Sequence, residues 1–273
     1  MPFAQPGNGE VNNPAGPDQW FNSLPFVTRY WFGATMIVTL SANFGIVSIP
    51  QVMYDWSLIK NNFEIWRFLT SFCFVGPFQF NTLISAYMLV QFSKQYEAGG
   101  PFNTGAGGGT ADYAFCLIFG AVAILLTFAI FPLDLPPVFS RNLIYYVLYV
   151  WSKRHPTSQA NIWGIPMAAN YLPFAYLALT VFMGSSWMDM LHGLAVGHLY
   201  YFLVDVVPAV YGKQVLTTPN FLLDYFGVGE YTPEVDAPPA AAGAGGGRRV
   251  AAAPPAAQAR HQWGTGGQRL GTQ

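Results

Sequence analysis

Four ionisable side chains lie within one apolar segment, residues 187–208: Asp189, His192, His198 and Asp205. Carboxylates and imidazoles can bind a metal ion or accept a proton, and ionisable groups inside a membrane helix usually face protein or water. A closed metal site needs at least three well-placed ligands, and the i+6 spacing of the two histidines suits one helix poorly. We therefore predict no metal site and no cofactor. The histidines are expected to be embedded polar groups, with His198 hydrogen-bonded inside a bundle and the aspartates marking the two membrane surfaces.

The same segment contains a pair of glycines, Gly193 and Gly197, at positions i and i+4. Residues four apart share one face of a helix, and small residues on that face let a neighbouring backbone approach closely. The spacing therefore predicts a helix-packing site.

The composition indicates a membrane protein. Of 273 residues, 52% are hydrophobic and only 9% are charged, whereas soluble domains carry roughly 25% charged residues. The net charge is -1 and the basic residues are scattered, which argues against nucleic acid as a partner. The two cysteines, Cys73 and Cys116, cannot form a disulfide framework, and we expect them toward opposite faces of the membrane.

Apolar stretches predict how the chain is positioned in the membrane, because crossing a 30 Å core takes about 20 residues. Six spans are predicted, at residues 30–50, 78–92, 113–131, 143–151, 165–183 and 187–207, and the fourth is conspicuously short. Residues 51–77 are predicted to form an interfacial loop and residues 99–109 a flexible linker. An even number of spans places both termini on one side, and the weak bias of basic residues favours the cytosol.

Two further segments follow the last span. Residues 217–227 predict a short helix on the membrane surface, with Thr218 as its N-cap and Pro219 at its first position. Alanine, glycine and proline then dominate, which predicts disorder ending in a docking peptide. The expected organisation is a cytosolic N-terminal segment, a membrane domain, a surface segment and a disordered tail, at residues 1–28, 29–210, 211–230 and 231–273.

An ordered series of short motifs resembles the derlin family, the rhomboid-like pseudoproteases of the endoplasmic reticulum. The motifs are Thr28-Arg29-Tyr30-Trp31-Phe32, Ile65-Trp66-Arg67, Ala111-Asp112-Tyr113, Leu148-Tyr149-Val150-Trp151, Tyr171-Leu172-Pro173, Val196-Gly197-His198-Leu199-Tyr200, and Thr218-Pro219 with Phe221-Leu222. The series, with the tail, looks most like the branch typified by the first derlin described in animals.

This resemblance implies an all-α membrane protein with a rhomboid-like bundle of six transmembrane helices, both termini cytosolic, and a disordered cytosolic tail. It also implies a role in degradation of misfolded endoplasmic reticulum proteins, by aiding their retrotranslocation. Short spans suggest that the bundle thins the bilayer locally, because lipid yields to hydrophobic mismatch. Trp66 and Arg67 in the first loop have two interpretations. They either anchor the loop at the headgroups, with the guanidinium reaching toward phosphate, or belong to a loop in the lumenal leaflet that disturbs lipid or holds substrate.

Catalysis is not expected, because the resemblance points to a missing dyad. An active rhomboid needs a serine within Gly-x-Ser-Gly at the start of span four and a histidine three residues before the first glycine of the span-six pair. Here Met190 occupies the histidine position, and Ser140, the hydroxyl near the start of span four, has no flanking glycine. An active intramembrane serine protease remains the alternative.

The tail carries the remaining partner prediction. Derlins end in a short box that binds the valosin-containing AAA ATPase, and this chain matches it with one extra residue through Trp263, Gly264, Gly266, Gly267, Arg269, Leu270 and Gly271. Other implied partners are misfolded clients, a membrane ubiquitin ligase, membrane lipid and further copies of the chain. A second alternative is a simple membrane receptor that only recruits the ATPase.

Overall fold

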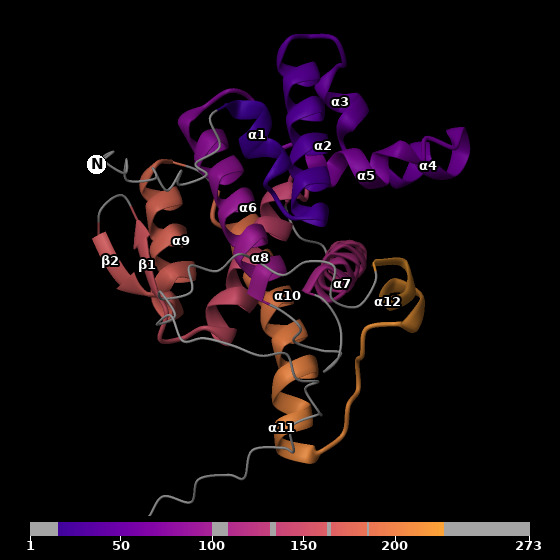
Figure 1. The fold of residues 1–273 in the computed structure, drawn as a ribbon. Helices are drawn as coiled ribbons and strands as arrows, with labels where there is room; N and C mark the ends of the chain where they lie inside the picture. The colour runs from indigo at the N-terminus through magenta and orange to yellow at the C-terminus, as the bar shows by residue number, and fades with distance from the viewer. Residues whose placement is uncertain (1–15, 100–108, 132–134, 163–164, 185, 227–273) are drawn as a thin grey trace, which may run out of the picture. The chain divides into compact units, whose positions relative to one another are not determined.

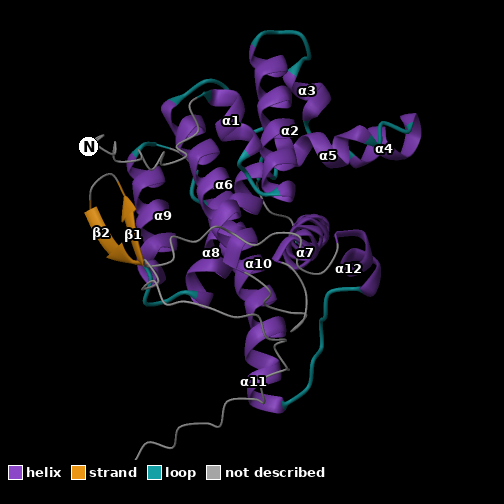
Figure 2. Cartoon of the chain, viewed as in Figure 1, coloured by secondary structure: helices purple, strands orange, loops and turns teal. Residues whose placement is uncertain are grey.

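The computed structural model describes residues 16–99, 109–131, 135–162, 165–184 and 186–226, all within the first of two compact units, Met1–Pro233. The described chain is almost entirely helical, with one hairpin (Figures 1 and 2). Its elements, in chain order, are α1 (Pro17–Asn22), α2 (Phe26–Asn43), α3 (Ile49–Val52), α4 (Trp56–Asn62), α5 (Trp66–Cys73), α6 (Phe80–Gly99), α7 (Gly109–Ile130), α8 (Ser140–Arg154), β1 (Gln159–Ile162), β2 (Ile165–Ala168), the 3-10 turn η1 (Ala169–Tyr171), α9 (Leu172–Phe182), α10 (Met188–Tyr201), the π-helical segment η2 (Phe202–Val206), α11 (Val207–Tyr211) and α12 (Asn220–Phe226).

Helix α8 lies at the centre of the helical core. Every residue from Asn142 to Ser152 is buried, and the helix contacts α5, α6, α7, α9 and α10. Its largest contact is with α10, which crosses the middle of Figure 1. The short fourth span predicted at 143–151 therefore lies inside a longer helix that other helices surround. Its tyrosines can be buried because their hydroxyls find partners, such as Tyr145 with Thr180 at 2.8 Å.

The first predicted span and the loop after it differ from expectation. The helix α2 starts at Phe26 and stops at Asn43, where Gly45 takes a positive φ of 73°, so residues 44–50 do not continue it. The predicted interfacial loop contains the short helices α4 and α5 and the second half of α3. Asp55 caps α4 by accepting hydrogen bonds from the backbone of Ser57 and Leu58, a local signal present in the sequence.

The predicted fifth span, 165–183, is partly wrong. Residues 165–168 form strand β2, which pairs antiparallel with β1 so that Gln159 faces Ala168. Only residues from Leu172 onward form the α-helix, and Pro173 stands in its first turn. In one helix over 165–183, Pro173 would lie in the interior, where proline removes a hydrogen bond and clashes with the preceding turn. Starting α9 at Leu172 places Pro173 in the first turn, where proline is tolerated.

The last span is longer than predicted. Helix α10, η2 and α11 run continuously from Met188 to Tyr211 and end at Gly212 in a left-handed conformation. This segment and Gly109–Ile130 are the two helices, among the described residues, that are long and apolar enough to cross a membrane by length and composition.

The short helix after the last span forms, but it begins differently from the prediction. Helix α12 starts at Asn220, and the Thr218 hydroxyl before it donates a hydrogen bond to the Asp112 carboxylate at 2.5 Å. The bond ties α12 to α7, which lie together in Figure 1. A buried carboxylate needs a hydrogen-bonding partner, and Thr218 supplies one to Asp112.

Candidate functional site

The two glycines of α10 lie directly against α8. A Cβ atom on Gly193 would fall 2.2 Å from the backbone oxygen of Asn142, and one on Gly197 would fall 3.0 Å from the Cβ of Tyr149 and 3.1 Å from the oxygen of Tyr146. Real Cβ atoms do not approach backbone so closely. The α8–α10 contact therefore requires the absence of a side chain at Gly193 and leaves little room at Gly197.

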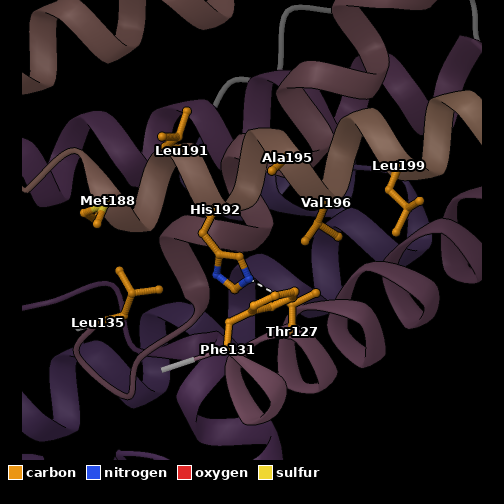
Figure 3. A pocket seen from close by; sticks show the side chains of 9 residues that line it. All are labelled: Thr127, Phe131, Leu135, Met188, Leu191, His192, Ala195, Val196 and Leu199. Carbon is orange, nitrogen blue, oxygen red and sulfur yellow. Dashed lines mark hydrogen bonds between the residues drawn. The ribbon is translucent and has the colours of Figure 1, made fainter. Parts of the chain in front are cut away.

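His192 lies beside this contact, and both of its ring nitrogens are hydrogen-bonded. Figure 3 shows the bond to Thr127. The Asn142 amide donates to Nδ1 at 3.0 Å, which leaves Nε2 to donate to the Thr127 hydroxyl at 2.7 Å. The Thr127 hydroxyl in turn donates to the Ala123 carbonyl at 2.7 Å. This chain of bonds joins α7, α8 and α10 and favours the neutral imidazole.

An apolar pocket of about 310 Å³ opens between α7 and α10 at His192. Figure 3 shows Phe131, Leu135 and Leu199 among the side chains around it. His192 is its principal polar group, and that group is already hydrogen-bonded. Among the described residues that line it, the pocket therefore offers no unused acid or base to a substrate.

The structure places Ser140 and Met190, the two positions singled out by the resemblance to rhomboids, in the interior. Ser140 is fully buried, and its hydroxyl donates to the Phe74 carbonyl at 2.5 Å. Met190 is also fully buried and has no basic atom. The histidine nearest to Met190 in sequence, His192, hydrogen-bonds Asn142 and Thr127 and not Ser140.

His198 lies one turn and a half further along α10. Its Nδ1 is 2.8 Å from the hydroxyl of Tyr149, and the two rings meet edge to face. It therefore makes the hydrogen bond to α8 that its position suggested. His192 and His198 belong to separate contacts, and no group of three or more His, Cys, Asp and Glu residues that could hold a metal occurs in the described part of the chain.

The two aspartates at the ends of the last span are paired with arginines, not simply exposed at membrane surfaces. Asp189 is 4% exposed and lies 3.3 Å from Nε of Arg141. Asp205 accepts from Nε and Nη2 of Arg154, the latter at 2.8 Å. A buried carboxylate is tolerated only with a cationic or hydrogen-bonding partner, so each aspartate links the last span to an end of α8.

Arg154 is the centre of a buried polar cluster. Its side chain is 5% exposed, its Nη1 donates to the hydroxyl of Tyr96, and its guanidinium lies over the rings of Tyr96 and Tyr200 at 5.3 and 5.8 Å. The π-helical turn η2 carries Asp205 to this cluster. Such turns are rare and often mark a constrained position.

Arg67 is buried in the first loop, and this contradicts the interpretation in which its guanidinium reaches lipid phosphate. Its side chain is 5% exposed, Nε donates to Glu64 at 2.6 Å, and Nη1 donates to the carbonyls of Pro50 and Met53 at 2.6 and 2.8 Å. Trp66, by contrast, is 53% exposed. Because the Arg67 guanidinium donates to two carbonyls and a carboxylate at once, it holds the loop helices together, while Trp66 faces outward.

We expect Arg67→Gln to lower the free energy of unfolding by about 2 kcal/mol, because it removes hydrogen bonds from a buried cation to two carbonyls and a carboxylate. The matched change Trp66→Ala is expected to shift it by about 0.5 kcal/mol or less, since the indole is half exposed. Denaturant titration of both purified variants in the same detergent checks the pair. Equal effects would contradict the division of roles between the two residues.

Other predicted residues lie apart from this core or outside the described chain. Cys73 and Cys116 are both free and buried. Most of the glycine linker lies outside the described residues. So do all the predicted tail residues: Trp263, Gly264, Gly266, Gly267, Arg269, Leu270 and Gly271. Sequence reasoning missed Thr127, Asn142 and Arg154 as partners. A polar residue within an apolar stretch is the one signal that could have identified Thr127.

The fold and the site together define the class of protein: an all-helical membrane protein whose central helix packs against a glycine-bearing last span. Residues 24–220 match the profile of the Der1-like family. The chain is 36% identical over 265 residues to mouse (Mus musculus) Derlin-1, covering 93% of this chain and 98% of that protein. It is 34% identical over 209 residues to Derlin-1 of Arabidopsis thaliana, covering 76% of each chain, and 34% identical over 230 residues to Derlin-1.1 of Zea mays, covering 83% of this chain and 92% of that one. The chain belongs to the derlin family.

Proposed function

We propose that this protein is a non-catalytic component of endoplasmic reticulum-associated degradation. In this proposal it spans the endoplasmic reticulum membrane six times in a rhomboid-like bundle with cytosolic termini, and it aids retrotranslocation of misfolded clients. Membership of the derlin family supports the general role. The blocked geometry at Ser140 and Met190 supports a mechanism without proteolysis.

The observation that carries the mechanism is a short helical segment with an exposed apolar surface. The turn η1 and helix α9 together extend about 22 Å, against a hydrocarbon core of roughly 30 Å. Phe174 and Phe182 on α9 are 58% and 90% exposed. Helix α8 is equally short but is enclosed by protein, so the mismatch that lipid meets is at α9. Thinner lipid there lowers the barrier for a polar chain.

The bilayer beside α9 is expected to be several ångströms thinner than beside α7, whose 22 residues extend about 33 Å. Cryo-EM of the protein in lipid nanodiscs would measure the headgroup separation at both helices, so α7 serves as an internal control. Equal thickness at the two helices would exclude local thinning.

In this proposal the tail binds the valosin-containing AAA ATPase, and the ATPase pulls the client into the cytosol. Glycines allow an extended backbone to lie close to a receptor, Trp263 and Leu270 can fill apolar pockets, and Arg269 can meet a carboxylate. A membrane ubiquitin ligase and further copies of the chain complete the proposed assembly.

A peptide covering residues 260–273 is expected to bind the ATPase, and Leu270→Ala is expected to weaken binding about ten-fold by removing an apolar anchor. Gln268→Ala, at a variable position of the box, is the matched control and should bind like the parent peptide. Titration calorimetry measures all three. Absence of binding by the parent peptide would refute recruitment through the tail.

A further inference from the structure

An apolar groove of about 850 Å³ lies between α2, α5 and α7, reaches Leu143 of α8, and shares no lining residue with the His192 pocket. Its walls include Ala34 on α2 and Ala121 on α7, where small side chains leave room between the helices. Leu69 of α5 lies at the groove and is 67% exposed. An apolar groove of this size accommodates a ligand of drug-like or lipid-like dimensions.

The length of the groove matches one leaflet of a bilayer. Along α7 its lining residues run from Ala114 to Leu125, a rise of about 16 Å. Half of a 30 Å hydrocarbon core is about 15 Å. The groove therefore has the depth that one acyl chain occupies when it extends from the headgroup region to the bilayer midplane.

The two ends of the groove differ in chemistry. Phe26 at the start of α2 and Phe226 of α12 line one end and contact each other at 5.7 Å between ring centroids. Tyr30 lines the same region, and the guanidinium of Arg29 lies 5.6 Å from its ring centroid. Arg29 forms no salt bridge with a carboxylate among the described residues. Aromatic rings with an unneutralised cation are typical of the headgroup level of a membrane.

We propose that this groove holds one acyl chain of a phospholipid, whose phosphate lies beside Arg29 in the leaflet where α2 begins. The apolar walls remove the chain from bulk lipid, the length fits one leaflet, and the positive charge meets the anionic headgroup. Bound in this way, the lipid fills the space between α2 and α7 and supports the packing of α5 and α12. The inference rests on the membrane orientation of the proposed function, but it requires neither bilayer thinning nor an ATPase.

Native mass spectrometry of the full-length protein, purified in detergent and supplied with phosphatidylcholine, tests the groove. The natural protein should retain one phospholipid per chain. Ala121→Trp and Ala34→Trp fill the groove from opposite walls, and each is expected to reduce the bound fraction at least five-fold. Leu126→Trp places the same indole at an exposed position of α7 outside the groove and should leave retention unchanged.

The headgroup end has its own test. With phosphatidylserine in competition with phosphatidylcholine, the natural protein should prefer the anionic lipid about five-fold, and Arg29→Gln should abolish that preference while keeping the bound chain. Failure of the natural protein to retain phospholipid, equal retention by all variants, or a second copy of the chain seated in the groove would overturn the proposal. The tail-binding and thickness measurements are independent of these outcomes.

Discussion

Gly193→Ala is expected to lower the free energy of unfolding by about 3 kcal/mol or more, a large effect for a single methyl group. The new Cβ would lie 2.2 Å from the Asn142 oxygen and 2.9 Å from its carbonyl carbon, so α8 and α10 would have to separate. Because backbone atoms cannot rotate away as a side chain can, the cost is not relieved locally. Denaturant titration of the purified protein in detergent, followed by tryptophan fluorescence, measures the loss.

Two variants on the same helix serve as controls for this prediction. Gly197→Ala meets its neighbours at 3.0 to 3.2 Å and should cost less, about 1 kcal/mol. Ala195→Leu adds more volume at an exposed position and should have little effect. The expected order of destabilisation is therefore Gly193, Gly197, Ala195. A loss at Ala195 equal to that at Gly193 would show that added bulk, not the α8 backbone, sets the cost.

Asp205→Ala is the second change with a large expected effect. It leaves Arg154, whose side chain is 5% exposed, without its carboxylate, and an uncompensated buried charge costs about 3 kcal/mol or more. The hydroxyl of Tyr96 cannot replace the carboxylate, because it carries no charge. Thermal unfolding in detergent should show a markedly less stable protein.

A double-mutant cycle separates the buried charge from general loss of packing. Arg154→Met alone removes the charge and leaves Asp205, which is 26% exposed, able to reach solvent, so its cost should be smaller. The double variant Arg154→Met with Asp205→Ala should recover most of the stability lost in Asp205→Ala. If the two single costs simply add, the ion pair does not explain the effect of Asp205.

The helical membrane character could be predicted from the sequence, because a bilayer imposes its requirement locally. Segments that cross it must be long, apolar and helical, and this requirement is visible in the residues themselves. The helices over residues 113–131 and 187–207 appear in the structure with slightly shifted ends. The prediction is wrong for residues 165–168 because an apolar stretch does not distinguish a short strand from the start of a helix. Pro173, in the middle of the stretch, is the local signal against one continuous helix.

The glycine spacing and the motif series were likewise readable along the chain, and the latter led to the derlin family. The partners of the buried polar side chains could not be predicted from the sequence. His192 pairs with residues 50 and 65 positions away, and Arg154 pairs with a residue 51 positions away. No local pattern specifies which of several distant polar groups will meet.

For this protein, then, residue types and their spacing along the chain were sufficient to establish a membrane-embedded helical chain, a glycine-lined helix face and a family. Folding in three dimensions decided which charges are neutralised, that Arg67 is buried in the first loop while Trp66 is exposed, and that an apolar groove opens between α2 and α7. The physical reason is that hydrophobic periodicity is a local property, whereas the cost of burying a charge is relieved by whichever partner the packed helices bring within reach.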